Sequence, residues 1–251
     1  MQNIIELFSS FQGEGQYVGI RQIFIRFAGC SLSCFYCDTA YARASHPKFC
    51  TVFDNTGRKK IIENPIPADH VLDLVEELHT PDVHSICYTG GEPLLSSAFV
   101  KEIAMKAKRR HFKNFIETSG CSRNAFASLA EYFEFASIDV KLRTHQAVRE
   151  KDYERLYEQE LDCVRIAVDR GIETIVKVVV LKQTSAEEIE KICRDLSGLD
   201  IKFVLQPVTA PRHLLEVAPG SKELFTLSAV AGRFLPDVMV IPQVHKVLGI
   251  L

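Results

Sequence analysis

The chain has 251 residues, 47% of them hydrophobic and 25% charged, and its formal net charge is −2. This balance is typical of a soluble protein with a full core, and so weak a charge gives no broad attraction to nucleic acid or to an anionic membrane. The start of the chain lacks the basic residues and apolar run of a signal peptide, and no apolar stretch is long enough to span a bilayer, so we expect a cytoplasmic protein.

Strand-type and helix-type segments alternate along most of the chain. We expect strands at residues 22–27, 85–88, 114–117, 133–140, 174–181, 201–205 and 238–241. We expect helices at residues 68–79, 96–110, 125–131, 146–170, 186–196 and 222–234. Nearly continuous apolar runs such as 175–181 are typical of parallel strands covered on both faces. The alternation predicts one α/β domain over residues 1–251, with a parallel sheet curved into a full or partial barrel.

Two local patterns refine this expectation. Ser185 followed by Glu188 predicts a capping box at the start of the helix at 186–196. Residues 40–67 break the alternation because they are polar and rich in turn residues. They predict an irregular insertion.

Three of the eight cysteines, Cys30, Cys34 and Cys37, lie in one short loop directly after the strand at 22–27. Their thiolates could hold three corners of an iron–sulfur cube. Because a closed cluster takes four cysteines, one iron would stay open to a small molecule. A zinc site with His46 or Cys50 as the fourth ligand is the alternative. The remaining cysteines are scattered singly, as is typical of buried inert thiols.

Polar residues and a pair of glycines also stand where most of the other expected strands end. They are Thr89, Gly90, Gly91, Glu92, Glu117, Thr118, Ser119, Asp139, Lys141, Gln206, Gln243, His245 and Lys246. Because the carboxyl ends of parallel strands meet at one end of a barrel, we expect these residues to line one mouth. Taken singly, each also has a structural explanation: Glu117 and Asp139 can cap helices or pair with surface cations, and a lone histidine is commonly structural.

A glycine-flanked loop near the N-terminus, Gln12-Gly13-Glu14-Gly15, has side chains that can donate to and accept from the edge of a heterocycle. An ordinary turn explains the same residues equally well.

The cysteine loop, with Tyr36 just before its last cysteine, and the run Gly90-Gly91-Glu92-Pro93 resemble the radical S-adenosylmethionine (SAM) superfamily. Within that superfamily, residues 10–15, 24–30, 37–39 and 243–246 look like the 7-carboxy-7-deazaguanine synthase family. The resemblance covers most of the chain and is weakest at residues 40–67. It implies a modified, partial (β/α)6-type barrel with parallel strands and outer helices.

The family converts 6-carboxy-5,6,7,8-tetrahydropterin to 7-carboxy-7-deazaguanine with loss of ammonia, on the route to queuosine or archaeosine. By this resemblance Cys30, Cys34 and Cys37 would hold a [4Fe–4S] cluster, and Thr39 would bind Mg²⁺, which prefers oxygen ligands. These four would be the catalytic residues. The residues that would contact SAM are Tyr36, Asp38, Gly91, Glu92, Ser119, Asp139, Lys141 and Gln206. The residues that would contact the pterin are Phe11, Gln12, Gly13, Glu14, Arg26, Thr89, His245 and Leu251.

The resemblance also implies a flavodoxin or ferredoxin as electron donor and a homodimer. The chain departs from the family at Asp139-Val140-Lys141, where the family often carries Ser-Pro-Lys, and in the tail after Lys246, which ends Val247-Leu248-Gly249-Ile250-Leu251. Two other functions stay open at this point: a radical SAM activase of a glycyl-radical protein, and a non-catalytic zinc or iron–sulfur protein. Gln12, Glu14 and Arg26 favour a small polar substrate over a protein.

Overall fold

Ten strands form one sheet in a computed structural model that describes residues 3–43, 46–54, 56–209 and 217–250. The order across the sheet is β10-β9-β8-β7-β6-β5-β2-β1-β3-β4. The strands are β1 (Ile4–Phe11), β2 (Arg21–Phe27), β3 (Phe49–Phe53), β4 (Lys59–Glu63), β5 (Ser85–Gly90), β6 (Asn114–Thr118), β7 (Phe135–Asp139), β8 (Glu173–Val180), β9 (Lys202–Pro207) and β10 (Val238–Val240). The run from β10 to β2 is parallel throughout, and its members are the strands expected from the sequence.

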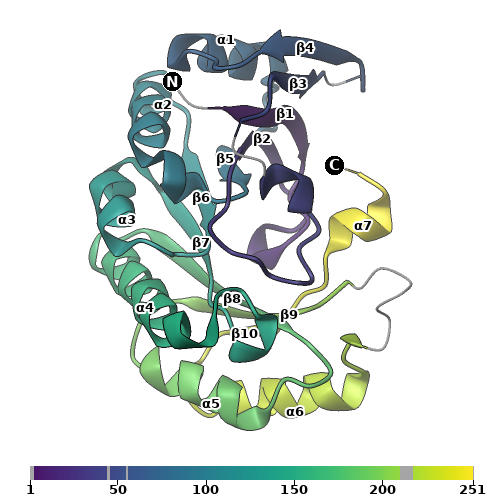
Figure 1. The fold of residues 1–251 in the computed structure, drawn as a ribbon, viewed down its shortest axis with the longest axis vertical. Coiled ribbons are helices and arrows are strands. Elements are labelled where there is room, and N and C mark those ends of the chain that lie inside the picture. Colours follow the sequence, from purple (N-terminus) through teal and green to yellow (C-terminus); the bar gives the residue numbers. More distant parts are fainter. Residues whose placement is uncertain (1–2, 44–45, 55, 210–216, 251) are drawn as a thin grey trace.

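Helices cover the outside of the curved sheet, as Figure 1 shows. The helices are α1 (Ala68–Leu78), α2 (Ser97–Arg109), α3 (Arg123–Leu129), α4 (Tyr153–Asp169), α5 (Ala186–Asp195), α6 (Ser221–Ala231) and α7 (Val244–Leu248). The capping box of α5 is confirmed, because Ser185 Oγ accepts from the Glu188 backbone N–H and the Glu188 carboxylate accepts from the Ser185 N–H. The short helix α7 follows β10 on the open side of the barrel, where no sequence pattern predicted it.

One expected helix begins later than predicted. The pattern at 146–170 predicted a continuous helix, but α4 begins only at Tyr153. Gln146 has a left-handed backbone with φ of 50°, and residues 150–152 form a separate 3-10 turn. A helix cannot run through a residue in that conformation, so the first residues of the expected helix form a loop instead.

The described part of residues 40–67 is not irregular throughout, contrary to the expectation from the sequence. It contains the hairpin of β3 and β4, which extends the sheet beyond β1. The Asp54 carboxylate closes the hairpin turn by accepting from the backbone N–H groups of Thr56 and Arg58. Strand β1, also missed by the sequence reading, pairs antiparallel with β2 and joins this hairpin to the parallel part.

The two faces of the parallel strands form separate cores, because successive side chains of a strand point to opposite faces. On β8, Val176, Val178 and Val180 pack outward under the helices. Ile175 on the same strand packs inward with aromatic side chains that include Phe24 and Phe115. Tyr17, from the β1–β2 loop, closes this inner cluster through edge contacts with other rings.

The inner face carries two layers of side chains. The apolar layer consists of Phe24, Cys87, Phe115, Ile175 and Val204. Two residues further along the same strands stand Arg26, Thr89, Glu117, Lys177 and Gln206, which with Asp139 at the end of β7 form the polar layer. Strand ends therefore bring the polar residues together above a packed apolar floor, as in other parallel barrels.

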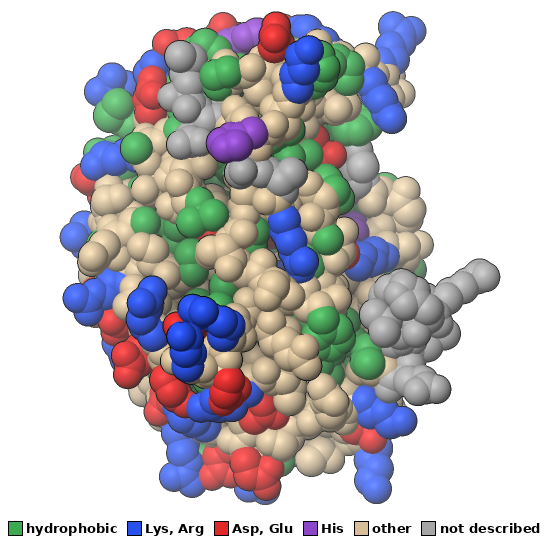
Figure 2. All heavy atoms as spheres, in the orientation of Figure 1, with side chains coloured by type: hydrophobic (Ala, Val, Ile, Leu, Met, Phe, Trp, Pro, Cys, Tyr) green, Lys and Arg blue, Asp and Glu red, His purple; other side chains and the backbone are tan. Residues whose placement is uncertain are grey.

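The outer surface mixes charges of both signs. On the face seen in Figure 2, Lys and Arg side chains are interspersed with Asp and Glu around the rim. No helix of the described residues has the length and apolar character needed to cross a membrane.

Candidate active site

The predicted site residues gather at one cavity above the polar layer. Every residue predicted to hold the cluster, Mg²⁺, SAM or the pterin lines it except Leu251, which lies outside the described residues. Lys246, expected at the same mouth, does not line the cavity but pairs with Asp38. The expectation that the strand ends share a mouth therefore agrees with the structure. The cavity is also lined by Glu117 and Gln243, which were expected at this mouth without a binding role, and by Arg43 and Lys177, which the sequence analysis did not single out.

The cysteine loop is held by its own backbone and by a neighbouring arginine. Cys37 N–H donates to the Cys34 carbonyl at 3.2 Å, and Arg43 Nη2 donates to the same oxygen at 2.5 Å. Burial raises the pKa of Cys30 to about 11, so an iron ion must displace the thiol proton when it binds. Because thiolates are the usual ligands of iron–sulfur clusters, three free thiols in one loop fit such a cluster.

The zinc alternative loses its proposed fourth ligand. Cys50 is fully buried in the outer core on β3, and His46 is exposed and does not line the cavity. Neither residue stands with the three cysteines of the loop.

Tyr36 is positioned by a buried histidine that the sequence reading missed. His145 Nδ1 accepts from the Leu142 N–H at 3.1 Å and lies 3.1 Å from the Tyr36 hydroxyl, while its Nε2 lies 2.8 Å from the Val179 carbonyl. Burial lowers the pKa of His145 to about 3, so the ring is neutral and Nε2 carries its proton. His145 thus ties the cysteine loop to β8.

The glycine pair after β5 serves close packing of the backbone. A side chain on Gly91 would overlap the carbonyl of Gly29 in the cysteine loop, and Gly90 has φ of +127°, which favours glycine. The next residue, Glu92, is buried and uses its carboxylate inside the protein. It accepts from Thr118 Oγ1 at 2.5 Å and from the Ser119 N–H at 2.8 Å. Glu92 therefore fixes the turn after β6 that carries Ser119.

Opposite charges alternate along the polar layer. Lys177 Nζ forms ion pairs with Glu14 and, at 3.2 Å, with Asp139, whose other oxygen lies 3.1 Å from Lys141 Nζ. Burial raises the pKa of Asp139, but the two ammonium groups reverse this effect and hold that pKa below its usual value. Asp139 is therefore a carboxylate in the folded protein.

A second set of hydrogen bonds surrounds Glu117. Its carboxylate accepts from Gln12 Nε2 at 2.8 Å and from Thr89 Oγ1 at 2.7 Å. Burial raises the pKa of Glu117, and the charge of Lys177 opposes the rise. Gln12 Oε1 also accepts from the Glu14 N–H at 3.0 Å, so Gln12 shapes the loop that presents Glu14.

Arg26 enters the cavity from β2. Its Nε lies 2.6 Å from Glu6, which also accepts from the Tyr41 hydroxyl at 3.0 Å. Because the carboxylate holds the guanidinium from one side, the planar group is fixed in orientation. A fixed guanidinium fork suits the bidentate binding of a ligand carboxylate.

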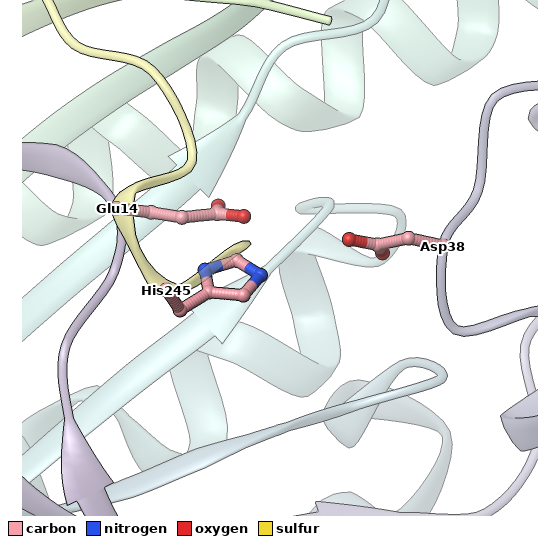
Figure 3. A group of neighbouring side chains, drawn as sticks. All are labelled: Glu14, Asp38 and His245. Carbon is pink, nitrogen blue, oxygen red and sulfur yellow. The ribbon is translucent and has the colours of Figure 1, made fainter. Parts of the chain in front are cut away.

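The C-terminal segment closes one side of the cavity. Glu14, Asp38 and His245 point toward one another from three separate segments, with ligand atoms within 4.8 Å (Figure 3). Such a trio is typical of a divalent metal site, but Gln243 Nε2 already donates to Glu14 at 2.7 Å and to Asp38 at 2.9 Å. Lys246 Nζ also pairs with Asp38 at 2.9 Å. We therefore interpret Gln243 and Lys246 as a latch that joins α7 to the cysteine loop.

Gly13 makes room for this latch. An added side chain there would overlap the ring of His245, and the Gly13 carbonyl accepts from the Val244 N–H at 2.8 Å.

Among the described residues, three buried polar atoms of side chains that line the cavity make no hydrogen bond: Arg43 Nε, Asp139 Oδ1, which pairs with the Lys177 ammonium group, and Gln206 Oε1. Gln206 is 3% exposed, and its Oε1 makes no hydrogen bond. A buried acceptor without a partner is costly, which indicates that a ligand donates to it. The cavity therefore fits a polar ligand beside the cysteine loop.

Comparisons with known proteins identify the family. Residues 24–196 match the family model described as the Radical SAM superfamily. The 7-carboxy-7-deazaguanine synthase of Methanocaldococcus jannaschii is 36% identical over 99% of this chain and 100% of its own length. The synthase of Methanothermobacter thermautotrophicus is also 36% identical, over 98% of this chain and 97% of its own length. The crystal structure of QueE from Escherichia coli shares the fold, with a TM-score of 0.57 and 18% sequence identity. The match covers 98% of this chain and 95% of the QueE chain. The chain therefore belongs to the radical SAM superfamily and, within it, to the family of 7-carboxy-7-deazaguanine synthases.

Proposed function

We propose that this protein is a 7-carboxy-7-deazaguanine synthase, a radical SAM lyase of 7-deazapurine biosynthesis. It contracts the ring of 6-carboxy-5,6,7,8-tetrahydropterin to 7-carboxy-7-deazaguanine with loss of ammonia, on the route to queuosine or archaeosine. The observation that carries the proposal is the likeness to synthases of that name over almost the whole of both chains. The polar layer supports it, because amide, carboxylate and guanidinium groups above an apolar floor suit a small polar heterocycle.

The [4Fe–4S] cluster and SAM follow from the family, and the residues of the cavity fit them. We assign Cys30, Cys34 and Cys37 to the cluster. When bound, the two cofactors supply the electron and the radical that the ring contraction requires. The chain's own groups bind and orient the ligands and exclude water. We assign SAM to the side of the cavity lined by Tyr36, Asp38, Gly91, Glu92, Ser119, Asp139, Lys141 and Gln206.

We assign the pterin to the adjoining part of the cavity. Glu14 would accept from the edge of the heterocycle, and Arg26, held by Glu6, would bind the substrate carboxylate. The other residues assigned here are Phe11, Gln12, Gly13, Thr89, His245 and Leu251. We further infer that Thr39 binds Mg²⁺, because its hydroxyl lines the cavity beside Cys37 and hard cations prefer oxygen.

Three finer points belong to the same proposal. The electron donor is a flavodoxin or ferredoxin, because reductive cleavage of SAM demands an electron of low potential. The enzyme is a homodimer and works in the cytoplasm. The substrate is a small molecule and not a glycyl-radical protein, since the groups assigned to it lie in a cavity among the strand ends.

The test is turnover under anaerobic conditions. Wild-type protein with a reconstituted cluster, SAM, Mg²⁺ and a reductant should convert 6-carboxy-5,6,7,8-tetrahydropterin to 7-carboxy-7-deazaguanine, detected by mass spectrometry. Protein that carries a full cluster and cleaves SAM, yet forms none of this product, would overturn the proposal.

A further inference from the structure

Lys177 is a buried charge in the middle of an apolar strand. It stands on β8 between Val176 and Val178, and only 6% of it is exposed. Burying an ammonium group destabilises the fold unless carboxylates pair with it, and an apolar residue of similar size is often as stable there or more so. Fold stability alone therefore does not explain a lysine at this position.

The position of Lys177 points it into the cavity. Side chains of β8 alternate, so that Ile175 and Lys177 face inward while Val176 faces the helices. The ammonium group cannot reach the outer surface from this face. Its charge instead pairs with carboxylates that line the cavity.

Three carboxylates from three different segments surround this ammonium group. Glu14 comes from the loop after β1, Asp139 from the end of β7, and Glu117 from β6. Burial lowers the pKa of Lys177, but these carboxylates more than offset it, so its pKa lies above the usual value and the charge is retained.

The two direct partners are assigned to different ligands. Glu14, which we assign to the pterin, also accepts a hydrogen bond from Gln243 of the latch on α7. Asp139, which we assign to SAM, also forms an ion pair with Lys141. Among the described residues, Lys177 is the one side chain with ion pairs to both.

We propose that Lys177 is a positioning residue that couples the two ligand sites, so that filling one orders the carboxylate that serves the other. The proposal rests on the function proposed above, because it takes Glu14 to contact the pterin and Asp139 to contact SAM. Coupling of this kind is reciprocal: each ligand changes the affinity of the other by the same factor.

The experiment measures binding and needs no turnover. Wild-type protein, Lys177→Met and Lys177→Arg are prepared with an oxidised cluster, which leaves SAM intact. Kd for SAM is measured with and without 6-carboxy-5,6,7,8-tetrahydropterin, and Kd for the pterin with and without SAM. We expect each ligand to tighten the other by about 10-fold in wild type. Lys177→Met should reduce this factor to about 1, and Lys177→Arg, which keeps the charge, should restore part of it.

Two further variants make the result specific. Lys202→Met removes an exposed lysine of the neighbouring strand β9, paired with Asp237, and should keep the wild-type coupling. Asp139→Asn leaves Lys177 and Glu14 in place but weakens the second ion pair, so it should lower the coupling even if Lys177→Met fails to fold.

The outcomes separate this inference from the proposed function. Full coupling in a folded Lys177→Met or in Asp139→Asn overturns the inference and leaves the function intact. Wild-type protein that binds SAM but no pterin overturns the proposed function, and the inference with it. Loss of coupling with unchanged iron content supports the role given to Lys177.

Discussion

The apolar and polar layers of the inner face lie two residues apart on the same strands, yet they have opposite requirements. Phe115 and Ile175 in the apolar layer are buried side chains that pack against rings and aliphatic groups. In the polar layer Lys177 is buried and Glu117 is partly exposed, and both carry ionisable groups that need partners from distant segments. The same strands therefore supply both the packed apolar layer and the polar groups that line the cavity. Substitutions in the two layers should therefore separate stability from chemistry.

The largest expected effect is the loss of the cluster in Cys34→Ala. Without the third thiolate the protein should retain little iron and show no detectable turnover. Iron and sulfide are counted after anaerobic reconstitution. The matched control is Cys87→Ala in the apolar layer, which removes a fully buried thiol and should keep the iron content of wild type. A Cys34→Ala protein with a full complement of iron would show that the cysteine loop has been misassigned.

The next effect is loss of stability in the apolar layer. Ile175→Ala should lower the free energy of unfolding by about 2–5 kcal/mol, because it leaves a cavity below the polar layer. Chemical denaturation measures this loss. Ile175→Val serves as the control and should cost about 0.5–1.5 kcal/mol. If the two variants are equally stable, the apolar layer is not packed as described.

A smaller effect comes from the neutral state of His145. Its pKa is lowered to about 3 in the folded protein, whereas an exposed histidine titrates near 6.5. The unfolded chain therefore binds the extra proton as pH falls below about 6.5, and the stability present above that pH is lost by about 1.4 kcal/mol per pH unit. The difference in unfolding free energy between wild type and His145→Gln, measured from pH 7 to pH 5, should shrink with this slope. A difference independent of pH would contradict a neutral buried ring.

The smallest expected effect is that of Tyr36→Phe. The variant loses one hydrogen bond, to His145, and should be destabilised by about 1 kcal/mol with its iron content unchanged. Thermal unfolding of the reconstituted protein measures the change. A loss of iron in this variant would mean that the hydroxyl, and not only the ring, holds the cysteine loop.

Much of the fold could be predicted because its signals are local. The parallel strands are apolar runs between helical patterns, and Ser185 with Glu188 marks the start of α5 within four residues. The hairpin of β3 and β4 could not be predicted in this way. Its strands are short, β4 exposes Lys59 and Lys60, and turn residues dominate the segment. Strand β1 also went unrecognised, and its place in the sheet depends on pairing with both β2 and β3.

The membership of the site could be predicted from strand ends and from the family resemblance, but the contacts within it could not. Lys177 and Glu14 are 163 positions apart in the chain, so their ion pair depends on how the sheet curves. Lys177 also had a signal that the reading passed over: it is the one charged residue in the apolar run at 175–181. A charge in a strand buried on both faces requires a buried partner. His145 gave no such signal. A helix was expected to begin at residue 146, directly after it, whereas in the structure α4 begins only at Tyr153 and a loop follows His145.

The most direct test of the division between the layers compares Glu117→Gln with Phe115→Ala on strand β6. Steady-state kinetics with the pterin and denaturant unfolding are measured on both variants. We expect Glu117→Gln to lower kcat/KM at least about 10-fold, equivalent to about 1.4 kcal/mol, while stability changes by less than about 1 kcal/mol. We expect Phe115→Ala to lose about 3–5 kcal/mol of stability and to keep kcat/KM within about threefold at temperatures where it is folded. The reverse pattern, with activity lost in Phe115→Ala and kept in Glu117→Gln, would contradict the account.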